Sequence, residues 1–230
     1  MVVLIWWGWG WRGKDEIVVC DVGQGSGAII MSGRTQVLVD TGPESGKMLD
    51  CLEKYMPAGD KKIEALIISH GDIDHMGGLE KIKKYYQIEQ IYSSGEIRRN
   101  DVFRWGKYVA EVVWPEVITG DDNADSVVLR VESGGGIFWF LGDITAEVEQ
   151  YLSWRSLWGG VGGVLVASHH GSKTATSNEL LETLKPEEVI ISVGKNNRYG
   201  HPSQEVIDRL IDQGIKIRRT DEEGDIMYEW

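Results

Sequence analysis

The sequence predicts an α/β protein of two similar halves, in which sheet packs on sheet and helices cover the outside. Apolar runs of strand length alternate with helix-length segments along the chain. Each half also reads strand, glycine turn, strand, acidic loop, helix, strand and then Ser-His. In the first half the acidic loop is Asp40-Thr41-Gly42 and the last strand leads to Ser69-His70, and in the second half these are Gly142-Asp143 and Ser168-His169. We expect the loops of both halves to meet at one edge.

The first half is predicted to be mostly sheet. Strands are expected at 16–22, 28–31, 36–39, 63–68 and 88–92, and helices at 47–56 and 79–86. Glycine-containing turns at 23–27 and 32–34 separate the first three strands, and Pro57 and Gly59 end the first helix.

The second half begins with one or two hairpins at 97–114. Further strands are expected at 127–131, 137–141, 164–167, 188–193, 215–219 and 226–230, and helices at 146–154, 177–184 and 203–212. Residues 221–225 are read as an acidic turn. No linker or low-complexity run interrupts the chain, so residues 16–230 are expected to form one domain.

The N-terminal segment, residues 1–15, is apolar and carries four of the ten tryptophans. Its apolar run is too short to form a membrane-spanning helix, and no cleavage site follows it. It could be an edge strand of the domain or the remnant of a membrane segment, and the sequence does not distinguish these.

The composition argues against one class of function. With 36 acidic against 24 basic residues the formal charge is −12, which argues against a simple electrostatic binder of nucleic acid. Cys20 and Cys51 form no C-x-x-C pair and lie in or beside apolar runs. We therefore expect two buried thiols rather than a disulfide.

The most informative stretch is His70-Gly71-Asp72-Ile73-Asp74-His75, which follows the apolar run Ala65–Ile68. Two imidazoles and two carboxylates directly after a buried strand are costly unless they bind something, and both groups are metal ligands. The chain has five histidines. His169 and His170 also follow an apolar strand, and His201 lies in a Tyr-Gly-His-Pro segment. This distribution predicts a metal site assembled from separate loops.

Several motifs occur together in a characteristic order. They are Asp21-Val22-Gly23-Gln24-Gly25, Asp40-Thr41-Gly42, Ser69-His70-x-Asp72-x-Asp74-His75-x-Gly77-Gly78, Gly142-Asp143, His169-His170-Gly171-Ser172 and Tyr199-Gly200-His201-Pro202. From about residue 16 to the C-terminus the chain resembles the metallo-β-lactamase superfamily, and within it the soluble domain of ComEC-type DNA uptake proteins and their stand-alone relatives. The resemblance implies a four-layer αββα sandwich and a hydrolase.

The resemblance also implies a site for one or two divalent metal ions. His70 and Asp72 would bind one ion and Asp74 and His75 the other, with Asp143 between them. A histidine of the 169–170 pair would complete the site: the internal repeat favours His169, and comparison with the superfamily favours His170. Asp40 would support the loop by hydrogen bonds.

The chain departs from the superfamily pattern at three points. Asp72 stands where a histidine is usual, as in the ComEC-type subgroup, and no isolated histidine precedes Asp143. The polar loop containing Asn123 and Ser126 occupies that region, so these two residues are candidate support or substrate contacts. The first metal position, that of His70 and Asp72, therefore has fewer nitrogen ligands. This favours Mn²⁺ relative to Zn²⁺, or leaves that position weakly occupied or empty. Ser26 replaces the subgroup's usual aspartate.

We expect hydrolysis of a phosphodiester in DNA by metal-activated hydroxide, with Asp74 and His201 as catalytic residues. His201 or Ser172 would contact the substrate or protonate the leaving group, and Lys173 would hold a phosphate. The resemblance implies a membrane channel protein as partner or parent chain, and an extracytoplasmic location. Two alternatives stay open: a metallo-hydrolase of a lactone, β-lactam or other small ester or amide, and a metal-stabilised binding domain without catalysis.

Overall fold

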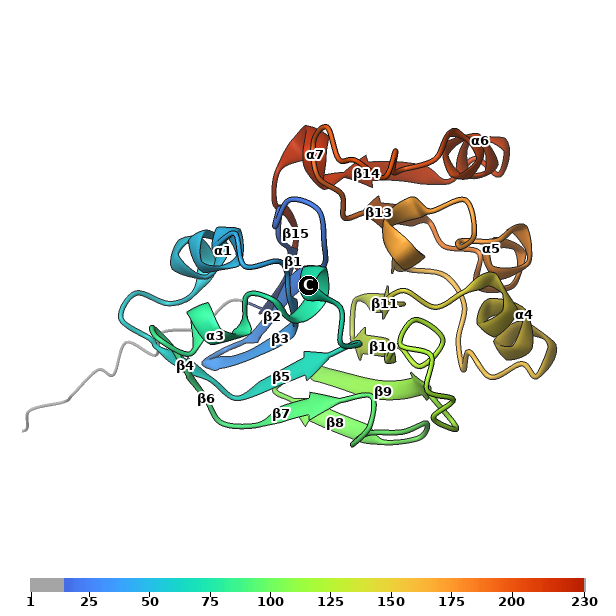
Figure 1. The fold of residues 1–230 in the computed structure, drawn as a ribbon. Helices are drawn as coiled ribbons and strands as arrows, with labels where there is room; N and C mark the ends of the chain where they lie inside the picture. The colour runs from blue at the N-terminus through green and yellow to red at the C-terminus, as the bar shows by residue number, and fades with distance from the viewer. Residues whose placement is uncertain (1–14, 230) are drawn as a thin grey trace, which may run out of the picture.

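The computed structural model describes residues 15–229, so the expectation for the Trp-rich segment lies outside the described residues. Two sheets face each other, and helices lie on the outer face of each (Figure 1). Within residues 15–229, no helix is long and apolar enough to cross a membrane.

The first sheet has the strand order β15-β1-β2-β3-β5-β7. Its strands are β1 (Asp15–Val19), β2 (Gly27–Ser32), β3 (Thr35–Thr41), β5 (Ala65–Ile68), β7 (Ile91–Ser93) and β15 (Ile226–Glu229). β15, β1, β2 and β3 are antiparallel neighbours, whereas β3, β5 and β7 run parallel. The C-terminal strand thus completes the sheet of the N-terminal half.

The second sheet has the order β14-β13-β12-β11-β10-β9-β8. Its strands are β8 (Val102–Trp105), β9 (Tyr108–Trp114), β10 (Val128–Ser133), β11 (Gly136–Phe140), β12 (Val164–Val166), β13 (Glu188–Ile191) and β14 (Lys216–Arg219). The β8–β9 pair is the hairpin expected within 97–114. β10 and β11 are antiparallel, and β11 to β14 run parallel.

The pairing confirms the internal repeat. β2 is antiparallel to β3 and β3 is parallel to β5, and β10, β11 and β12 have the same relation. Each repeat carries one helix before its last strand, α1 (Lys47–Tyr55) in the first and α4 (Ala146–Trp154) in the second. The parallel strands of each half therefore end at one edge of their sheet.

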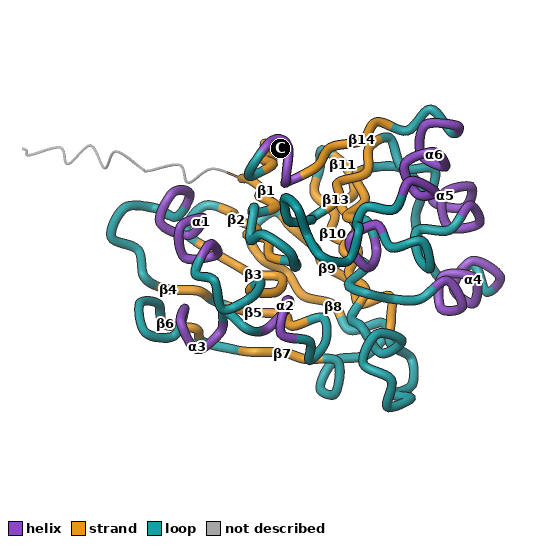
Figure 2. The backbone as a smooth tube through the Cα atoms, turned by 45° about the horizontal axis from the view of Figure 1, so that its top comes forward, coloured by secondary structure: helices purple, strands orange, loops and turns teal. Residues whose placement is uncertain are grey.

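The remaining elements are short or cover the sheets (Figure 2). α3 (Leu79–Ile82) lies with α1 over the first sheet, and α5 (Asn178–Leu184) and α6 (Gln204–Asp212) lie with α4 over the second. The others are a ribbon of β4 (Lys62–Ile63) and β6 (Gln87–Ile88), the single turns α2 (Ile73–Met76) and η1 (Ser168–Gly171), and α7 (Thr220–Glu223). The helix expected over 79–86 ends at Ile82, and the expected acidic turn begins as α7.

Three apolar clusters fill the spaces between four layers. Side chains alternate across each strand, so Ile30 of β2 packs between the sheets while Ile29 packs against the helices of the first half. In β11, Phe138 and Phe140 face the first sheet, and Trp139 faces the helices of the second half. The predicted four-layer αββα sandwich with two similar halves is confirmed.

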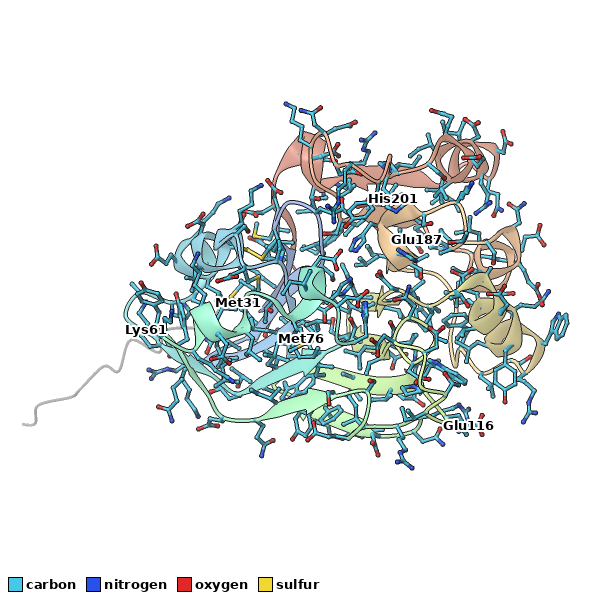
Figure 3. The ribbon with its side chains drawn as sticks, viewed as in Figure 1. Met31, Lys61, Met76, Glu116, Glu187 and His201 are labelled. Atoms are coloured by element: carbon cyan, nitrogen blue, oxygen red, sulfur yellow. A yellow bond between two sulfur atoms is a disulfide. The ribbon has the colours of Figure 1, made fainter. Side chains whose placement is uncertain are left out.

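The expectation of two free thiols is wrong. Cys20 and Cys51 form a disulfide with Cα atoms 6.0 Å apart, and both are buried (Figure 3). Cys20 directly follows β1, and Cys51 lies on the face of α1 that packs on this sheet. Their closeness depends on how the helix packs on the sheet, which cysteine spacing in the sequence does not encode.

Candidate metal centre

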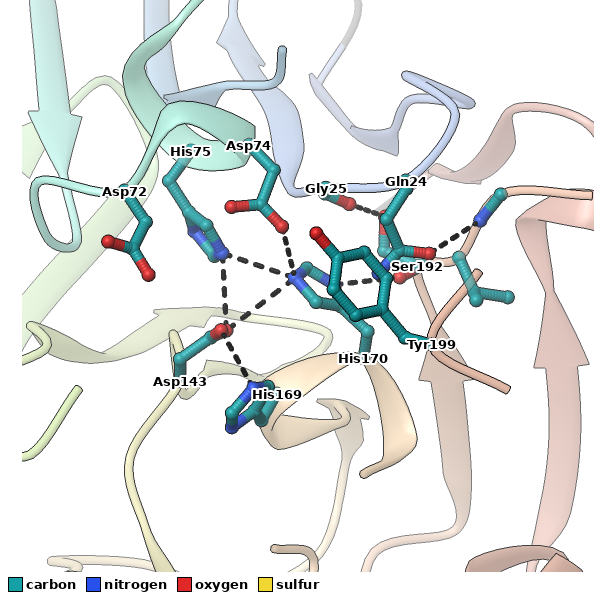
Figure 4. Close-up of polar contacts among 12 residues, drawn as sticks. Gln24, Gly25, Asp72, Asp74, His75, Asp143, His169, His170, Ser192 and Tyr199 are labelled. Carbon is teal, nitrogen blue, oxygen red and sulfur yellow. Dashed lines mark hydrogen bonds and ion pairs between the residues drawn. The ribbon is translucent and has the colours of Figure 1, made fainter. Parts of the chain in front are cut away.

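The candidate site lies where parallel strands end. β3 ends next to Asp40, β5 leads into Ser69 and His70, and β11 leads through Gly142 to Asp143. β12 leads into η1, which carries His169 and His170. Since the sheets pack with these ends at one edge, loops far apart in sequence bring their polar side chains together (Figure 4).

His75 and His170 direct the same ring nitrogen at one point. His75 Nδ1 lies 2.8 Å from Asp40 Oδ2, and His170 Nδ1 lies 2.9 Å from the carbonyl oxygen of Ser192. Because a carbonyl and a carboxylate only accept hydrogen bonds, each Nδ1 carries the proton and donates. The two Nε2 atoms are then acceptors in the neutral rings, yet they lie 3.2 Å apart. A proton or a metal ion between them would satisfy both.

The ring of His70 is also oriented by a contact at its Nδ1 atom. Its Nδ1 lies 3.0 Å from Ser69 Oγ, which also lies 3.0 Å from Asp40 Oδ2. The backbone N–H of Ser69 donates to Asp40 Oδ1 at 2.7 Å. His70 Nε2 is buried and has no hydrogen-bond partner among the described residues. An unpaired buried nitrogen aimed into a cluster of carboxylates is what a metal ligand without its ion would show.

Asp143 lies between two groups of ligand-type side chains. Its Oδ1 lies 3.2 Å from His75 Nε2 and 3.7 Å from His170 Nε2, and Asp74 Oδ2 lies 3.4 Å from the same His170 atom. We call Asp74, His75 and His170 the inner cluster. Asp143 Oδ2 lies 3.8 Å from His169 Nε2 and 4.0 Å from His70 Nε2. Asp72 Oδ2 lies 3.5 Å from His70 Nε2, and we call His70, Asp72 and His169 the outer cluster.

The buried carboxylates of this site favour a positive charge beside them. Burial disfavours the charged form of His75, but the carboxylates of Asp40 and Asp143 outweigh it and raise the pKa of His75 well above its usual value. Burial opposes ionisation of Asp143, yet His75 and the neighbouring histidines lower its pKa. Without a metal ion, the buried carboxylates thus keep a proton on His75. The oxygen and nitrogen donors and their fixed orientation fit a divalent ion such as Zn²⁺ or Mn²⁺.

The backbone around the ligands adopts conformations that non-glycine residues rarely take. Asp40, His169 and His170 have φ angles of 59°, 48° and 54°. Such residues cost free energy and persist where the surroundings hold them, commonly at functional sites. With these backbone angles, the ring of His169 lies beside Asp143 Oδ2 and the ring of His170 lies beside Asp143 Oδ1. Both therefore reach the site, which the repeat and the family comparison had offered as alternatives.

Comparisons with known proteins show which sequences and folds the chain is similar to. The family model described as "Metallo-beta-lactamase superfamily" matches residues 20–128. Competence protein ComA of Neisseria gonorrhoeae is 32% identical over 227 residues, which are 94% of this chain and 32% of that protein. ComE operon protein 3 of Bacillus subtilis strain 168 is 30% identical over 259 residues, 94% of this chain and 33% of that protein.

The fold adds independent support. The metallo-beta-lactamase fold protein YhfI from Bacillus subtilis superposes with a TM-score of 0.64 at 14% identity, covering 94% of this chain and 100% of that one. The chain has the metallo-β-lactamase fold. The expectation of a metal-dependent hydrolase agrees with the family model that matches residues 20–128, and one of the relatives named here is a competence protein. The chain spans about a third of the length of those curated relatives.

The other predicted site residues lie at different distances from the candidate ligands. Ser126 Oγ accepts a hydrogen bond from the backbone N–H of Asp143 at 3.2 Å, so it supports that ligand. Within residues 15–229, Asn123 supports the loop through its backbone carbonyl, which accepts a hydrogen bond from the N–H of Ser126. Ser172 Oγ lies 3.0 Å from Thr174 Oγ1, and Lys173 is exposed.

His201 reaches the cluster through a ring contact. Its ring centroid lies 6.0 Å from that of His169, next to Asp143. Burial lowers the pKa of His201, and His169 and His170 lower it further. The imidazole of His201 is therefore neutral near neutral pH.

The sequence interpretation missed several supporting residues. Ser69 joins three of the site's side chains through one hydroxyl, and Ser192 orients His170 through its carbonyl. The 23–27 turn is also part of the site, because the N–H of Ser26 donates to the carbonyl of Asp74 at 3.0 Å. A Cβ on Gly25 would lie 2.2 Å from that carbonyl oxygen, so only glycine fits there. The position of Ser69 between two ligand-type motifs was the available signal for its role.

Proposed function

We propose that this chain is a metal-dependent phosphodiesterase that cleaves DNA. The observation that carries the proposal is the position of Asp143, whose two carboxylate oxygens face two separate ligand clusters. Sites that hold two metal ions about 4 Å apart are common among phosphatases and nucleases, because the ions can clamp the attacking and leaving oxygens of one phosphate.

The role proposed for each residue follows from its position in the site. Asp74, His75 and His170 would hold one ion and His70, Asp72 and His169 the other, with Asp143 shared. When bound, the ions supply Lewis acidity that makes water acidic enough to act as a nucleophile near neutral pH. Asp40 and Ser69 keep the imidazoles in the required tautomer. Asp72 is half exposed and Asp74 a quarter exposed, so substrate approaches from their side.

His201 and Lys173 are proposed to contact the substrate. His201 is neutral and lies beside His169, so it can hydrogen-bond a phosphate or the leaving oxygen. Lys173 follows the His169-His170 turn, is exposed, and can reach a phosphate further along the strand. Neither residue holds the metal ions in this scheme.

The biological setting is proposed to be DNA uptake outside the cytoplasm. One relative is named as a competence protein and another as ComE operon protein 3, and this chain matches about a third of each. The buried disulfide between Cys20 and Cys51 supports an oxidising compartment, because disulfides are rare in the cytosol of most organisms. Under this proposal a membrane channel protein is the partner or the parent chain.

The test is nuclease activity on single- and double-stranded DNA after chelation and re-addition of Mn²⁺ or Zn²⁺. We expect cleavage that requires metal and that falls by more than about a hundredfold in Asp74→Ala. Asp212→Ala is the matched control, because this carboxylate is exposed at the end of α6. Absence of cleavage with every metal, in protein shown to bind metal, would rule out the proposal and redirect the search to lactone and β-lactam substrates.

A further inference from the structure

A row of aromatic rings leads from the outer cluster to the protein surface. The ring centroids of His169 and His201 lie 6.0 Å apart, and those of His201 and Tyr199 lie 5.9 Å apart with planes inclined by 14°. The series begins at Asp143, whose Oδ2 is 3.8 Å from His169 Nε2. Figure 4 labels Tyr199, His169 and Asp143 around the same site. The row thus connects the metal ligands with an accessible ring.

Tyr199 is unusual because a large ring in a polar loop is 54% exposed. The guanidinium carbon of Arg198 lies 4.9 Å from its ring centroid, and Arg198 Nη2 donates a hydrogen bond to the Tyr199 hydroxyl at 2.8 Å. A flat cation thus lies over a face of the ring that a flat base could occupy instead. Exposed aromatic rings next to Arg side chains are the usual stacking surfaces of proteins that bind single-stranded nucleic acid.

The loop that carries this ring is fixed by one side chain. Asn197 Oδ1 accepts hydrogen bonds from the backbone N–H groups of Tyr199 and His201, at 3.1 and 3.0 Å. Its Nδ2 donates to the carbonyls of Gly194 and His201. A surface held in place before binding loses less conformational entropy when a ligand arrives. The loop is therefore built to present Tyr199 and His201 together.

Basic side chains without carboxylate partners lie on and near this loop, although the chain as a whole is acidic. Lys173, Lys195 and Arg198 form no salt bridge within residues 15–229. By contrast, Arg219 pairs with Asp221 and Glu222 nearby. An open pocket beside His201 is lined by Lys195, Asn196, Asn197, Gly200, His201, Arg219, Asp221 and Glu222, and its two carboxylates are the ones that pair with Arg219. Cations without carboxylate partners can bind the phosphates of a strand whose bases stack on the rings.

We propose that Tyr199, with His201 and Arg198, forms a stacking platform that binds an unpaired nucleobase beside the metal centre and makes single-stranded nucleic acid the preferred ligand. The inference rests on the proposed phosphodiesterase function and specifies single-stranded nucleic acid as the substrate of that site. A base in a duplex is already paired and stacked, so it cannot lie flat on Tyr199. An unpaired base can, while Arg198 moves to the adjoining phosphate.

Binding and cleavage are measured on the metal-loaded protein with three ligands of equal length. These are single-stranded oligothymidylate, the same backbone with tetrahydrofuran abasic units in place of the bases, and a DNA duplex. Fluorescence anisotropy uses labelled phosphorothioate versions that resist hydrolysis, so binding is read without catalysis. Tyr199→Ala is compared with Tyr199→Phe, and Tyr85→Ala serves as control because Tyr85 is an exposed tyrosine next to α3.

We expect Tyr199→Ala to raise the Kd and KM for oligothymidylate about tenfold, the loss typical of one stacked base. The Kd for the abasic strand should not change, Tyr199→Phe should bind normally, and the wild type should prefer the single strand to the duplex. Unchanged Kd in Tyr199→Ala would overturn the platform even if the protein cleaves DNA, and so would equal affinity for the duplex. Tyr199-dependent binding without any cleavage would support the platform and reject the phosphodiesterase function.

Discussion

Asp143 is the residue on which the ligand geometry depends most, because each of its oxygens serves a different cluster. Replacing His70 or His170 removes a ligand from one cluster alone. We therefore expect Asp143→Ala to lose metal from both, and His70→Ala and His170→Ala to lose it mainly from the outer and the inner cluster. Inductively coupled plasma mass spectrometry after dialysis measures the metal content, and circular dichroism checks that each variant is folded. Full metal content in Asp143→Ala would contradict the shared position.

Glu149 is a second buried carboxylate, and it works outside the metal site. It lies on α4 and accepts hydrogen bonds from the backbone N–H groups of Thr176 and Ser177, at 2.7 and 2.8 Å. It thereby holds the chain between the histidine turn and α5. Glu149→Gln keeps the shape, but its amide has one acceptor oxygen in place of two and turns its NH2 group toward the other backbone N–H. We therefore expect a loss of about 1–3 kcal/mol in the free energy of unfolding. Urea denaturation measures it, and Glu147→Gln on the exposed side of α4 is the control.

The pKa of Glu149 also predicts a pH effect. Burial raises this pKa, and hydrogen bonds from Ser177 and Thr176 only partly oppose the shift. The folded protein then binds a proton that the unfolded chain releases near pH 4.5. The contribution of Glu149 to stability is therefore largest below that pH and declines as the pH rises toward the folded-state pKa. Stability curves measured across this window should differ between wild type and Glu149→Gln, and parallel curves would contradict the assignment.

At the scale of the element, the Cys20–Cys51 disulfide ties the end of β1 to α1. The bridge closes a segment with a sequence separation of 31. Closing a loop of this length restricts the unfolded chain, so Cys20→Ser/Cys51→Ser should be less stable by about 3–4 kcal/mol. Denaturation with and without a reductant tests this, since reductant should destabilise the wild type but not the variant. Two free thiols in the unreduced, unfolded protein would show that the bridge does not form.

At the scale of the whole molecule, the proposed metal centre would join the two halves of the sandwich. His70, Asp72, Asp74 and His75 follow the first sheet, whereas Asp143, His169 and His170 follow the second. An ion that binds only the folded protein stabilises it by about 2.7 kcal/mol at a free concentration of a hundred times its Kd. We expect chelation to lower the Tm and re-addition of Mn²⁺ or Zn²⁺ to restore it. Calorimetry measures the shift, and Asp143→Ala should show none.

The secondary structure and the general site were predictable because they depend on local patterns. Alternating and continuous apolar runs marked strands such as β2 and β5. The helices expected from residues 177 and 203 are α5 and α6, and the structure adds that the hydroxyls of Ser177 and Ser203 cap them. The His-x-Asp-x-Asp-His segment and the His169-His170 pair marked the candidate ligands. Strand ends accounted for their meeting, since parallel strands in a repeat finish at a common edge.

Tertiary structure decided what depends on distances between segments remote in sequence. Sequence alone determined the two-half sandwich, the ligand-type residues and the edge where they gather. Only packing placed Cys20 against Cys51, turned His169 and His170 to opposite sides of Asp143, and aligned Tyr199 with His201. These relations follow from how helices and sheets lie on one another and from left-handed backbone turns at single residues, and neither leaves a periodic signal in the order of amino acids.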